Sequence, residues 1–215
     1  MQRQEKYQSG FTLIEMIVSL AVFTTVIGIS VGSLLILIGS NRQLQTEQTV
    51  MTNLSFALDS MTREIRTGVH YYCESSPNTN GANNIFNPAN NLDTILGETV
   101  NDCPNGRAGN QSLHGIAFSE GGDSITGLED RILYYHDADD GKIYRRVGDG
   151  PAQSIVSSGI YVTDADFYVT GSEPLSNNEE TQSMVTIFIE ARDINDPTNK
   201  AYKIQTTVTQ RTLDI

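Results

Sequence analysis

The chain has no tryptophan and few basic residues: 14 Lys and Arg stand against 26 Asp and Glu, a formal net charge of −12. A protein that holds the phosphate backbone of nucleic acid needs a basic surface. The acidic balance therefore disfavours nucleic acid as a partner of the whole chain. Arg145 and Arg146 are the one basic pair that could form a small polyanion patch, and we interpret them as a solvated strand edge.

Recognisable metal and catalytic motifs are also absent. The three histidines, His70, His114 and His136, are far apart and have no CxxC or HExxH partner, so zinc is not predicted. The one Gly-x-Ser-x-Gly run, Gly28-Ile29-Ser30-Val31-Gly32, lies inside a long apolar stretch and not between a strand and a helix, so it is not a nucleophile elbow. The chain has no glycine-rich phosphate loop and no catalytic cysteine signature. We expect no catalytic residue, no metal ion and no cofactor.

A calcium site is suggested only by Asp137, Asp139 and Asp140. An EF-hand loop starting at Asp137 would need an oxygen ligand at its fifth position and a Glu at its twelfth, where this chain has Gly141 and Gly148. The aspartates and the glycine fit a hairpin turn instead.

Charge is missing from one long stretch, the 26 residues from Met16 to Asn41. About 20 apolar residues span the hydrocarbon core of a bilayer, so this stretch predicts a transmembrane helix. The basic residues Arg3 and Lys6 precede it, which places the N-terminus in the cytoplasm, although Arg42 lies on the other side. No second stretch of this kind follows Arg42.

Only two cysteines are present, Cys73 and Cys103, both in the polar part of the chain. An even number outside the cytoplasm suggests one disulfide. Closing a loop of about 30 residues would stabilise the fold by about 3.5 kcal/mol in the chain-entropy estimate. The alternative is two free thiols in a reducing compartment. We expect the disulfide, and with it a head outside the cytoplasm.

The N-terminus differs from an ordinary secretory signal because the small residue, Gly10, precedes the apolar stretch instead of following it. Cleavage there would leave the hydrophobic segment on the mature protein as an anchor. Glu15 is the one ionisable group between Lys6 and Arg42. A carboxylate at that depth is costly, so it is either hydrated near the interface or paired with a partner.

The run Gly10-Phe11-Thr12-Leu13-Ile14-Glu15, followed by the apolar stretch, resembles the prepilin signal of type IV pilins and type II secretion pseudopilins. The resemblance implies a leader at residues 1–10, cleavage between Gly10 and Phe11 by a membrane prepilin peptidase, and N-methylation of Phe11. It also implies that Glu15 meets the Phe11 amine of a neighbouring subunit. Residues 11–40 would then be the transmembrane assembly segment, and partners would include other pilins and the inner-membrane assembly machinery.

The helical pattern continues beyond the membrane over residues 41–68. The first proline is Pro77, Gly68 is a stop signal, and apolar residues recur at helical spacing: Leu44, Met51, Leu54, Leu58, Met61 and Ile65. We predict one helix over residues 12–67, about 85 Å long at 1.5 Å per residue.

After Gly68 the chain divides into an Asn-rich, disulfide-bounded loop region at residues 69–114 and a β-rich head at residues 115–215. The loop region is either an exposed surface for a partner or a tolerated insertion. Strands are predicted at Gly115–Ser119, Arg131–His136, Lys142–Val147, Ile160–Thr170, Met184–Arg192 and Ala201–Arg211. The predicted fold class is α+β, with the long transmembrane helix packed on an antiparallel β-sheet head, the "lollipop" of pilins.

Three segments are similar to J-type minor pseudopilins and W-type minor pilins: the helix residues 58–66, the hairpin residues 132–146 and the closing residues 204–211. The interpretation is a non-enzymatic minor subunit of a type IV pilus or type II secretion system, contributing to an initiating tip complex. It would be a single-pass inner-membrane protein with its C-terminal head in the periplasm or outside the cell. The alternatives are a major pilin, an adhesive or DNA-binding tip pilin, and a membrane-anchored binding protein or enzyme.

Overall fold

The computed structural model describes residues 10–97, 99–120, 131–172 and 182–211. The predicted leader therefore lies outside the described residues except for Gly10. The chain forms two compact units, Met1–Gln45 and Thr46–Ile215. We describe each unit by itself.

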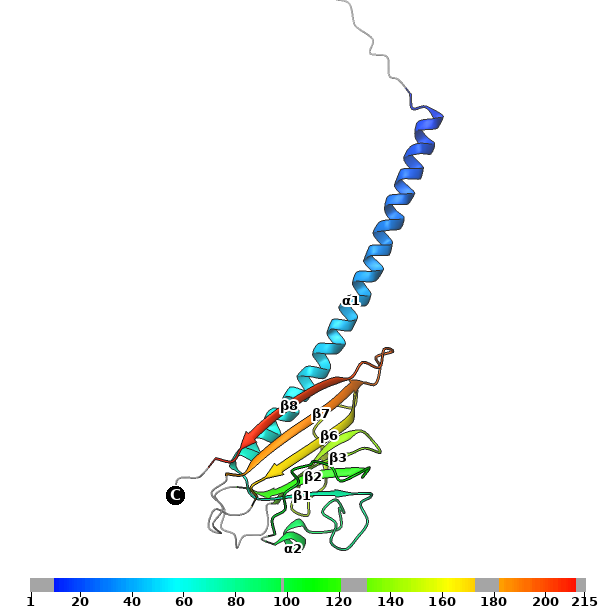
Figure 1. Ribbon diagram of the computed structural model, residues 1–215. Helices are drawn as coiled ribbons and strands as arrows, with labels where there is room; N and C mark the ends of the chain where they lie inside the picture. The colour runs from blue at the N-terminus through cyan, green and yellow to red at the C-terminus, as the bar shows by residue number, and fades with distance from the viewer. Residues whose placement is uncertain (1–9, 98, 121–130, 173–181, 212–215) are drawn as a thin grey trace, which may run out of the picture. The chain divides into compact units, whose positions relative to one another are not determined.

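One helix, α1 (Leu13–Thr67), runs through the first unit and into the second (Figure 1). No proline interrupts it, and the apolar residues Val50, Leu54, Ala57, Leu58, Met61 and Ile65 are its buried positions. Of the apolar residues that recur at helical spacing in the sequence, Leu54, Leu58, Met61 and Ile65 are buried as expected. The expectation was wrong for Leu44, which is 55% exposed, and it missed Val50 and Ala57.

The helix ends at Gly68, as predicted, but for a packing reason. A Cβ at Gly68 would lie 2.5 Å from the ring of Phe118, so only glycine lets the chain pass this close to the sheet. The next strand starts at once.

The second unit contains two antiparallel sheets, and the predicted α+β class is confirmed. Sheet A has the order β1-β2-β3-β4-β5 and sheet B the order β6-β7-β8. The strands are β1 (Val69–Ser76), β2 (Leu113–Ser119), β3 (Arg131–Asp137), β4 (Lys142–Val147), β5 (Gln153–Ser154), β6 (Ile160–Thr170), β7 (Met184–Asp193) and β8 (Tyr202–Thr209). The six predicted strands correspond to β2, β3, β4, β6, β7 and β8, while β1 and β5 were missed.

The central strands of sheet A, β2 and β3, are buried on both faces. Ile116 and Phe118 of β2 point into a main core with α1 and sheet B, whereas Leu113 and Ala117 of the same strand point into a second core. The alternation of side chains along a strand produces this division. The second core is closed by Ile85, Phe86, Leu92 and Leu96, the last two on the short helix α2 (Leu92–Leu96).

The Asn-rich segment is thus an ordered cover of sheet A, since its asparagines hold its turns. The side-chain oxygens of Asn78, Asn84 and Asn87 accept hydrogen bonds from the backbone N–H groups two residues further on. Asn91 caps α2 by accepting from the N–H of Thr94 at 3.0 Å. Asparagine favours such local bonds, so a composition that resembles a loop can produce defined structure.

Arg146 also holds this cover in place, which corrects its interpretation as a solvated edge. It is 1% exposed, and its guanidinium donates to the backbone oxygens of Asn87 (2.7 Å), Asn90 and Gly148 (3.2 Å). Arg145 lies on the other face of β4 and forms a half-exposed ion pair with Glu64 of α1 at 3.0 Å. The two adjacent arginines therefore have opposite roles because a strand sends successive side chains to opposite faces.

The Asp137–Gly141 turn joins β3 and β4 as the predicted hairpin. Gly141 has a φ of 65°, which favours glycine, and a Cβ there would lie 2.4 Å from the ring of Tyr161. The aspartates bond within the turn: the carboxylate of Asp137 accepts from the N–H of Asp139 at 3.0 Å.

Candidate functional site

The N-terminal end of α1 carries the residues that the sequence singled out. Gly10 and Phe11 precede the helix and are exposed, Phe11 by 76%. Thr12 is positioned to cap the helix, because the N–H of Glu15 lies 3.4 Å from its hydroxyl oxygen. The structure therefore places Gly10, Phe11 and Glu15 within about one helical turn of each other, at the point where the helix begins.

Thr12 and Glu15 have the spacing of a capping box, a signal that our sequence reasoning missed. In this motif an N-cap Thr and a Glu three residues later satisfy free N–H groups of the first turn. A carboxylate there also interacts favourably with the positive end of the helix dipole. Glu15 thus has a local structural role available to it, and any assembly role has to be separated from that one. Among the described residues, its carboxylate forms no hydrogen bond or ion pair.

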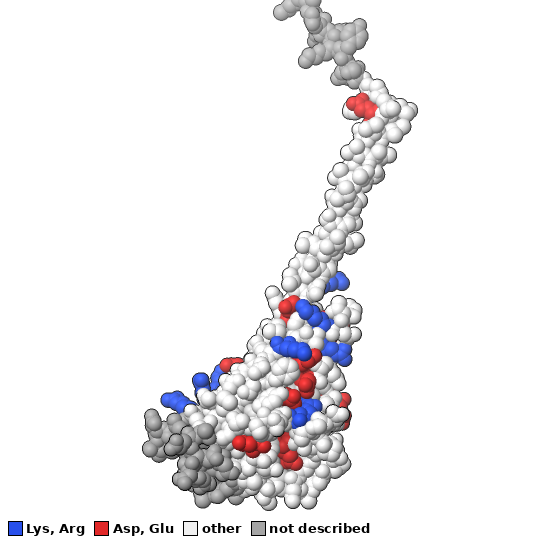
Figure 2. Space-filling view, in the orientation of Figure 1, with Lys and Arg blue, Asp and Glu red and all other residues white. Residues whose placement is uncertain are grey.

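The rest of the first unit is suited to a lipid surrounding. Its large apolar side chains are exposed on all sides, and in Figure 2 the surface of this helix is almost free of charge. Within the described part of the chain, α1 is the one helix long and apolar enough to cross a membrane.

The polar side chains of this apolar segment are satisfied within the helix. Hydroxyls of Ser19, Thr25, Ser30 and Ser33 donate to the carbonyl oxygens four residues earlier, at 2.7–2.9 Å. Since an unsatisfied polar group in hydrocarbon is costly, these bonds remove the main penalty of placing hydroxyls there. Glu15 differs from them, since it is the one ionisable side chain in the segment.

In the second unit the predicted disulfide joins Cys73 and Cys103, with a Cα–Cα distance of 5.8 Å. Cys73 lies in β1, and Cys103 pairs through its backbone with Val169 of β6. The bridge therefore ties sheet A to the segment that borders sheet B. His114 lies within 4.8 Å of both sulfurs, but sulfurs engaged in a disulfide are not available as thiolate metal ligands.

A buried polar cluster lies beside the disulfide, and sequence reasoning missed it. His114 and His136 are far apart in the chain but directly paired across β2 and β3, and both are 0% exposed. His114 Nε2 donates to the carbonyl of Phe167 (2.9 Å), and its Nδ1 lies 2.8 Å from the hydroxyl of Ser75. His136 ends the predicted strand Arg131–His136, whereas His114 directly precedes the predicted strand Gly115–Ser119. Each histidine shares a strand face with a buried residue two positions away, Tyr134 or Ile116, and that spacing was the signal that could have placed them inside.

Arg107 completes this cluster. It lies 2.8 Å from Nδ1 of His136 and forms ion pairs with Asp164 (3.2 Å) and Asp166 (3.4 Å). Burial lowers the pKa of His136 to about 4, and the nearby Arg107 charge adds to that effect. Burial also lowers the pKa of His114. The arrangement holds both imidazoles neutral between the sheets, which is a packing role.

Comparison with known proteins places the N-terminal site in a family context. Residues 6–31 match the prokaryotic N-terminal methylation motif. This match includes Gly10, Phe11 and Glu15 and supports a type IV pilin-like or pseudopilin protein. Searches of the curated proteins and of the solved structures found no match. The pilin-type motif points to a structural protein that is processed by a prepilin peptidase and assembles with other pilins.

Proposed function

We propose that this protein is a minor structural subunit of a type IV pilus or type II secretion pseudopilus. The observation that carries the proposal is the methylation motif at residues 6–31, followed by a helix able to cross a membrane and a disulfide-linked head. The similarity of residues 58–66, 132–146 and 204–211 to J-type and W-type subunits favours a place in an initiating tip complex. Copy number distinguishes this role from a major pilin, which would dominate sheared filaments in mass spectrometry.

Processing comes first. Cleavage between Gly10 and Phe11 removes the leader and creates a new α-amine on Phe11, which is then N-methylated and remains cationic. The exposure of both residues ahead of the helix suits access by a peptidase. The apolar helix stays on the mature chain and anchors it in the inner membrane.

Assembly then pairs opposite charges. In a bundle of apolar helices an unpaired carboxylate and an unpaired ammonium each carry a large desolvation cost. Placing Glu15 of one subunit against the Phe11 amine of its neighbour offsets both costs and fixes the axial register of the two helices. A subunit that reaches the membrane but cannot form this pair should insert normally and dock poorly.

The head lies outside the cytoplasm in this proposal. The disulfide between Cys73 and Cys103 supports that side, because such bonds persist in oxidising compartments. The basic residues of the leader, Arg3 and Lys6, suit the cytoplasmic side.

The test is Glu15→Gln in the full chain. Glutamine keeps the acceptor of a capping box but removes the charge, so we expect normal cleavage at Phe11, normal membrane insertion and loss of at least about tenfold in crosslinking to neighbouring subunits. Thr12→Ala is the matched control, since it removes the cap and leaves the charge, and it should assemble. Wild-type crosslinking of Glu15→Gln would refute the pairing role, and a mature chain that begins anywhere other than Phe11 would refute the pilin proposal itself.

A further inference from the structure

In the described part of the second unit, no strand pairs with the side of β8 that faces away from β7. β8 is the last strand of sheet B and pairs only with β7 among the described strands. A free edge carries unpaired N–H and C=O groups, and proteins commonly block such edges with Lys, Pro, a bulge or a covering helix. Helix α1 meets this edge at Arg211, beyond the end of β8. Between Gln205 and Thr209 this edge has no Lys or Pro, and its register with β7 has no bulge.

The hydrogen bonds at the end of β8 define which groups face outward. The N–H of Gln210 donates to the carbonyl of Ser183, toward β7, at 2.9 Å. Because successive residues of a strand alternate in direction, the backbone groups of Gln205, Thr207 and Thr209 point away from β7. In agreement, the N–H of Arg211 points outward and donates to the carbonyl of Arg66, the last turn of α1, at 2.8 Å.

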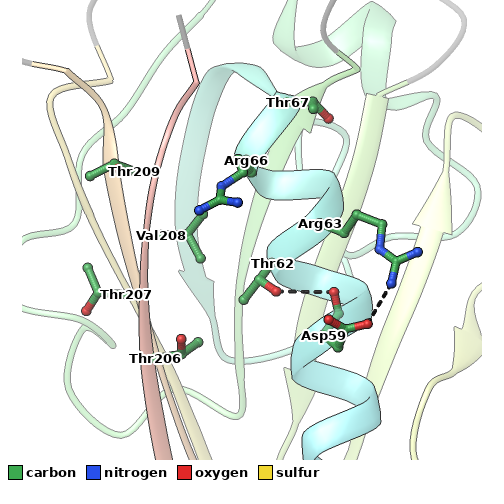
Figure 3. Close-up of a pocket in the computed structure, with 9 residues that line it drawn as sticks. All are labelled: Asp59, Thr62, Arg63, Arg66, Thr67, Thr206, Thr207, Val208 and Thr209. Atoms are coloured by element: carbon green, nitrogen blue, oxygen red, sulfur yellow. Dashed lines mark hydrogen bonds and ion pairs between the residues drawn. The ribbon is translucent and has the colours of Figure 1, made fainter.

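A groove lies beside this edge. It has a volume of about 450 Å³ and is lined by α1 from Asp59 to Thr67 and by residues 206–209 of β8. Figure 3 shows that Thr206 and Val208 extend toward the helix, whereas Thr207 and Thr209 extend away from it. The groove therefore combines a polar helix face with a strand that has an open backbone edge.

Three charged side chains line the groove, Asp59, Arg63 and Arg66, and the first two pair with each other. In Figure 3 the guanidinium of Arg66 lies in the space between α1 and Val208, whereas Arg63 points to the opposite side of the helix and pairs with Asp59 at 2.7 Å. Among the described residues, the Arg66 side chain has no hydrogen bond or ion pair. Arg66 is exposed, so its guanidinium is accessible to a ligand, and a carboxylate is the group that pairs with it best.

We propose that the outer edge of β8 binds an extended, acidic segment of a partner protein as a fourth strand of sheet B, with Arg66 pairing a carboxylate of that segment. Outward backbone groups repeat every two residues, about 6.6 Å apart, and this repeat matches a second strand but not a sugar or a small anion. From Gln205 to Thr209 there is room for about four residues of added strand. This surface lies in the second unit and is independent of the N-terminal pairing proposed above.

The experiment uses the full chain in detergent micelles and a fluorescently labelled hexapeptide of alternating valine and glutamate, followed by anisotropy. We expect saturable binding and protection of the amides of Gln205, Thr207 and Thr209 from hydrogen exchange. The same peptide with lysine in place of glutamate should bind at least about tenfold more weakly, as should the valine–glutamate peptide with alternate backbone amides N-methylated.

Substitutions in the groove and in β8 test separately how the Arg66 charge and the strand edge contribute to peptide binding. Arg66→Gln should weaken binding of the acidic peptide about tenfold, whereas Lys203→Gln, which removes a positive charge from the same strand outside the groove, should change it less than about twofold. Thr207→Pro removes an outward N–H without losing a backbone hydrogen bond to β7, so the sheet should still fold cooperatively and the peptide should no longer bind. It also removes the hydroxyl contact with Thr186 of β7 (2.9 Å), and Thr207→Val, which loses that contact alone, is its control and should bind the peptide. Absence of peptide binding, equal binding of the lysine peptide, or full binding to folded Thr207→Pro would overturn the proposal.

Discussion

Acidification should destabilise the second unit through His136. This side chain is 0% exposed, its Nε2 donates to the carbonyl of Val162 at 3.1 Å, and its Nδ1 faces the guanidinium of Arg107 at 2.8 Å. The neutral ring satisfies both partners. Burial disfavours the charged ring and is the main reason that the pKa lies near 4, and a second proton on Nδ1 would in addition put two cations in contact.

The loss of folding free energy follows from the difference between the pKa of His136 in the folded and in the unfolded chain. The unfolded chain protonates this histidine near its ordinary pKa of 6.5, and the folded chain only near 4. The unfolded state therefore binds more protons between these values, so the stabilising contribution is complete above about pH 6.5 and is lost as pH falls toward 4. The loss is about 2 kcal/mol at pH 5 and about 3 kcal/mol at pH 4.

The assay is urea unfolding of the full chain in detergent at pH 7.5, 6, 5 and 4, with wild type compared with His136→Gln. Glutamine keeps a donor for Val162 but does not titrate, and every other ionisable group is common to the two proteins. We expect the wild type to lose about 2 kcal/mol more than the variant between pH 7.5 and 5. Parallel stability curves over that interval would refute the assignment of the acid sensitivity to His136, whatever the absolute stability of the variant.

The disulfide and the buried arginine give two further tests, in addition to those of Glu15 and of the β8 edge. Cys73→Ser should lower the free energy of unfolding by about 3.5 kcal/mol under oxidising conditions, and a reductant should lower the wild type to the level of the variant; an unchanged melting temperature would contradict the disulfide. Arg146→Met should cost about 2–4 kcal/mol, because one buried and two partly buried carbonyl oxygens lose their donor, and should expose the amides of the Asn-rich cover to hydrogen exchange. Arg145→Met is its control and should cost no more than about 1 kcal/mol, since that ion pair is half-exposed; equal effects of the two changes would contradict the role given to Arg146.

The parts of the fold that the sequence predicted are those with strong local patterns. The helix follows from an uninterrupted apolar stretch without proline, and β4 and β6 match their predicted bounds because turn residues flank each of them. The Asp137–Gly141 hairpin has local chemistry that only a turn satisfies well.

The parts that were missed depend on tertiary contacts. Strand β1 follows Gly68 without a turn, and its Tyr71 and Cys73 become buried only because β2 pairs with it. The burial of Arg146 depends on a segment about 60 residues earlier that supplies carbonyl oxygens to it. His114 and His136 come together through the register of two strands, which periodicity alone does not fix.

The sequence predicted the N-terminal candidate site but not the groove beside β8. Gly10, Phe11 and Glu15 form a short contiguous motif, so the sequence could identify them without the fold. The groove beside β8 joins residues near 63 to residues near 207, and no pattern in either segment predicts the other.

The contact between α1 and the end of β8 also bears on how the polypeptide reaches its native state. Helix α1 is joined to the end of β8, which lies far from it in the sequence, and the carbonyl of Arg66 meets the N–H of Arg211 only after both segments have been synthesised. Contacts of such high sequence separation slow folding and leave apolar surface uncovered in the meantime. The Leu54, Leu58 and Met61 side of the helix is therefore open to aggregation until β7 and β8 have formed and cover the core.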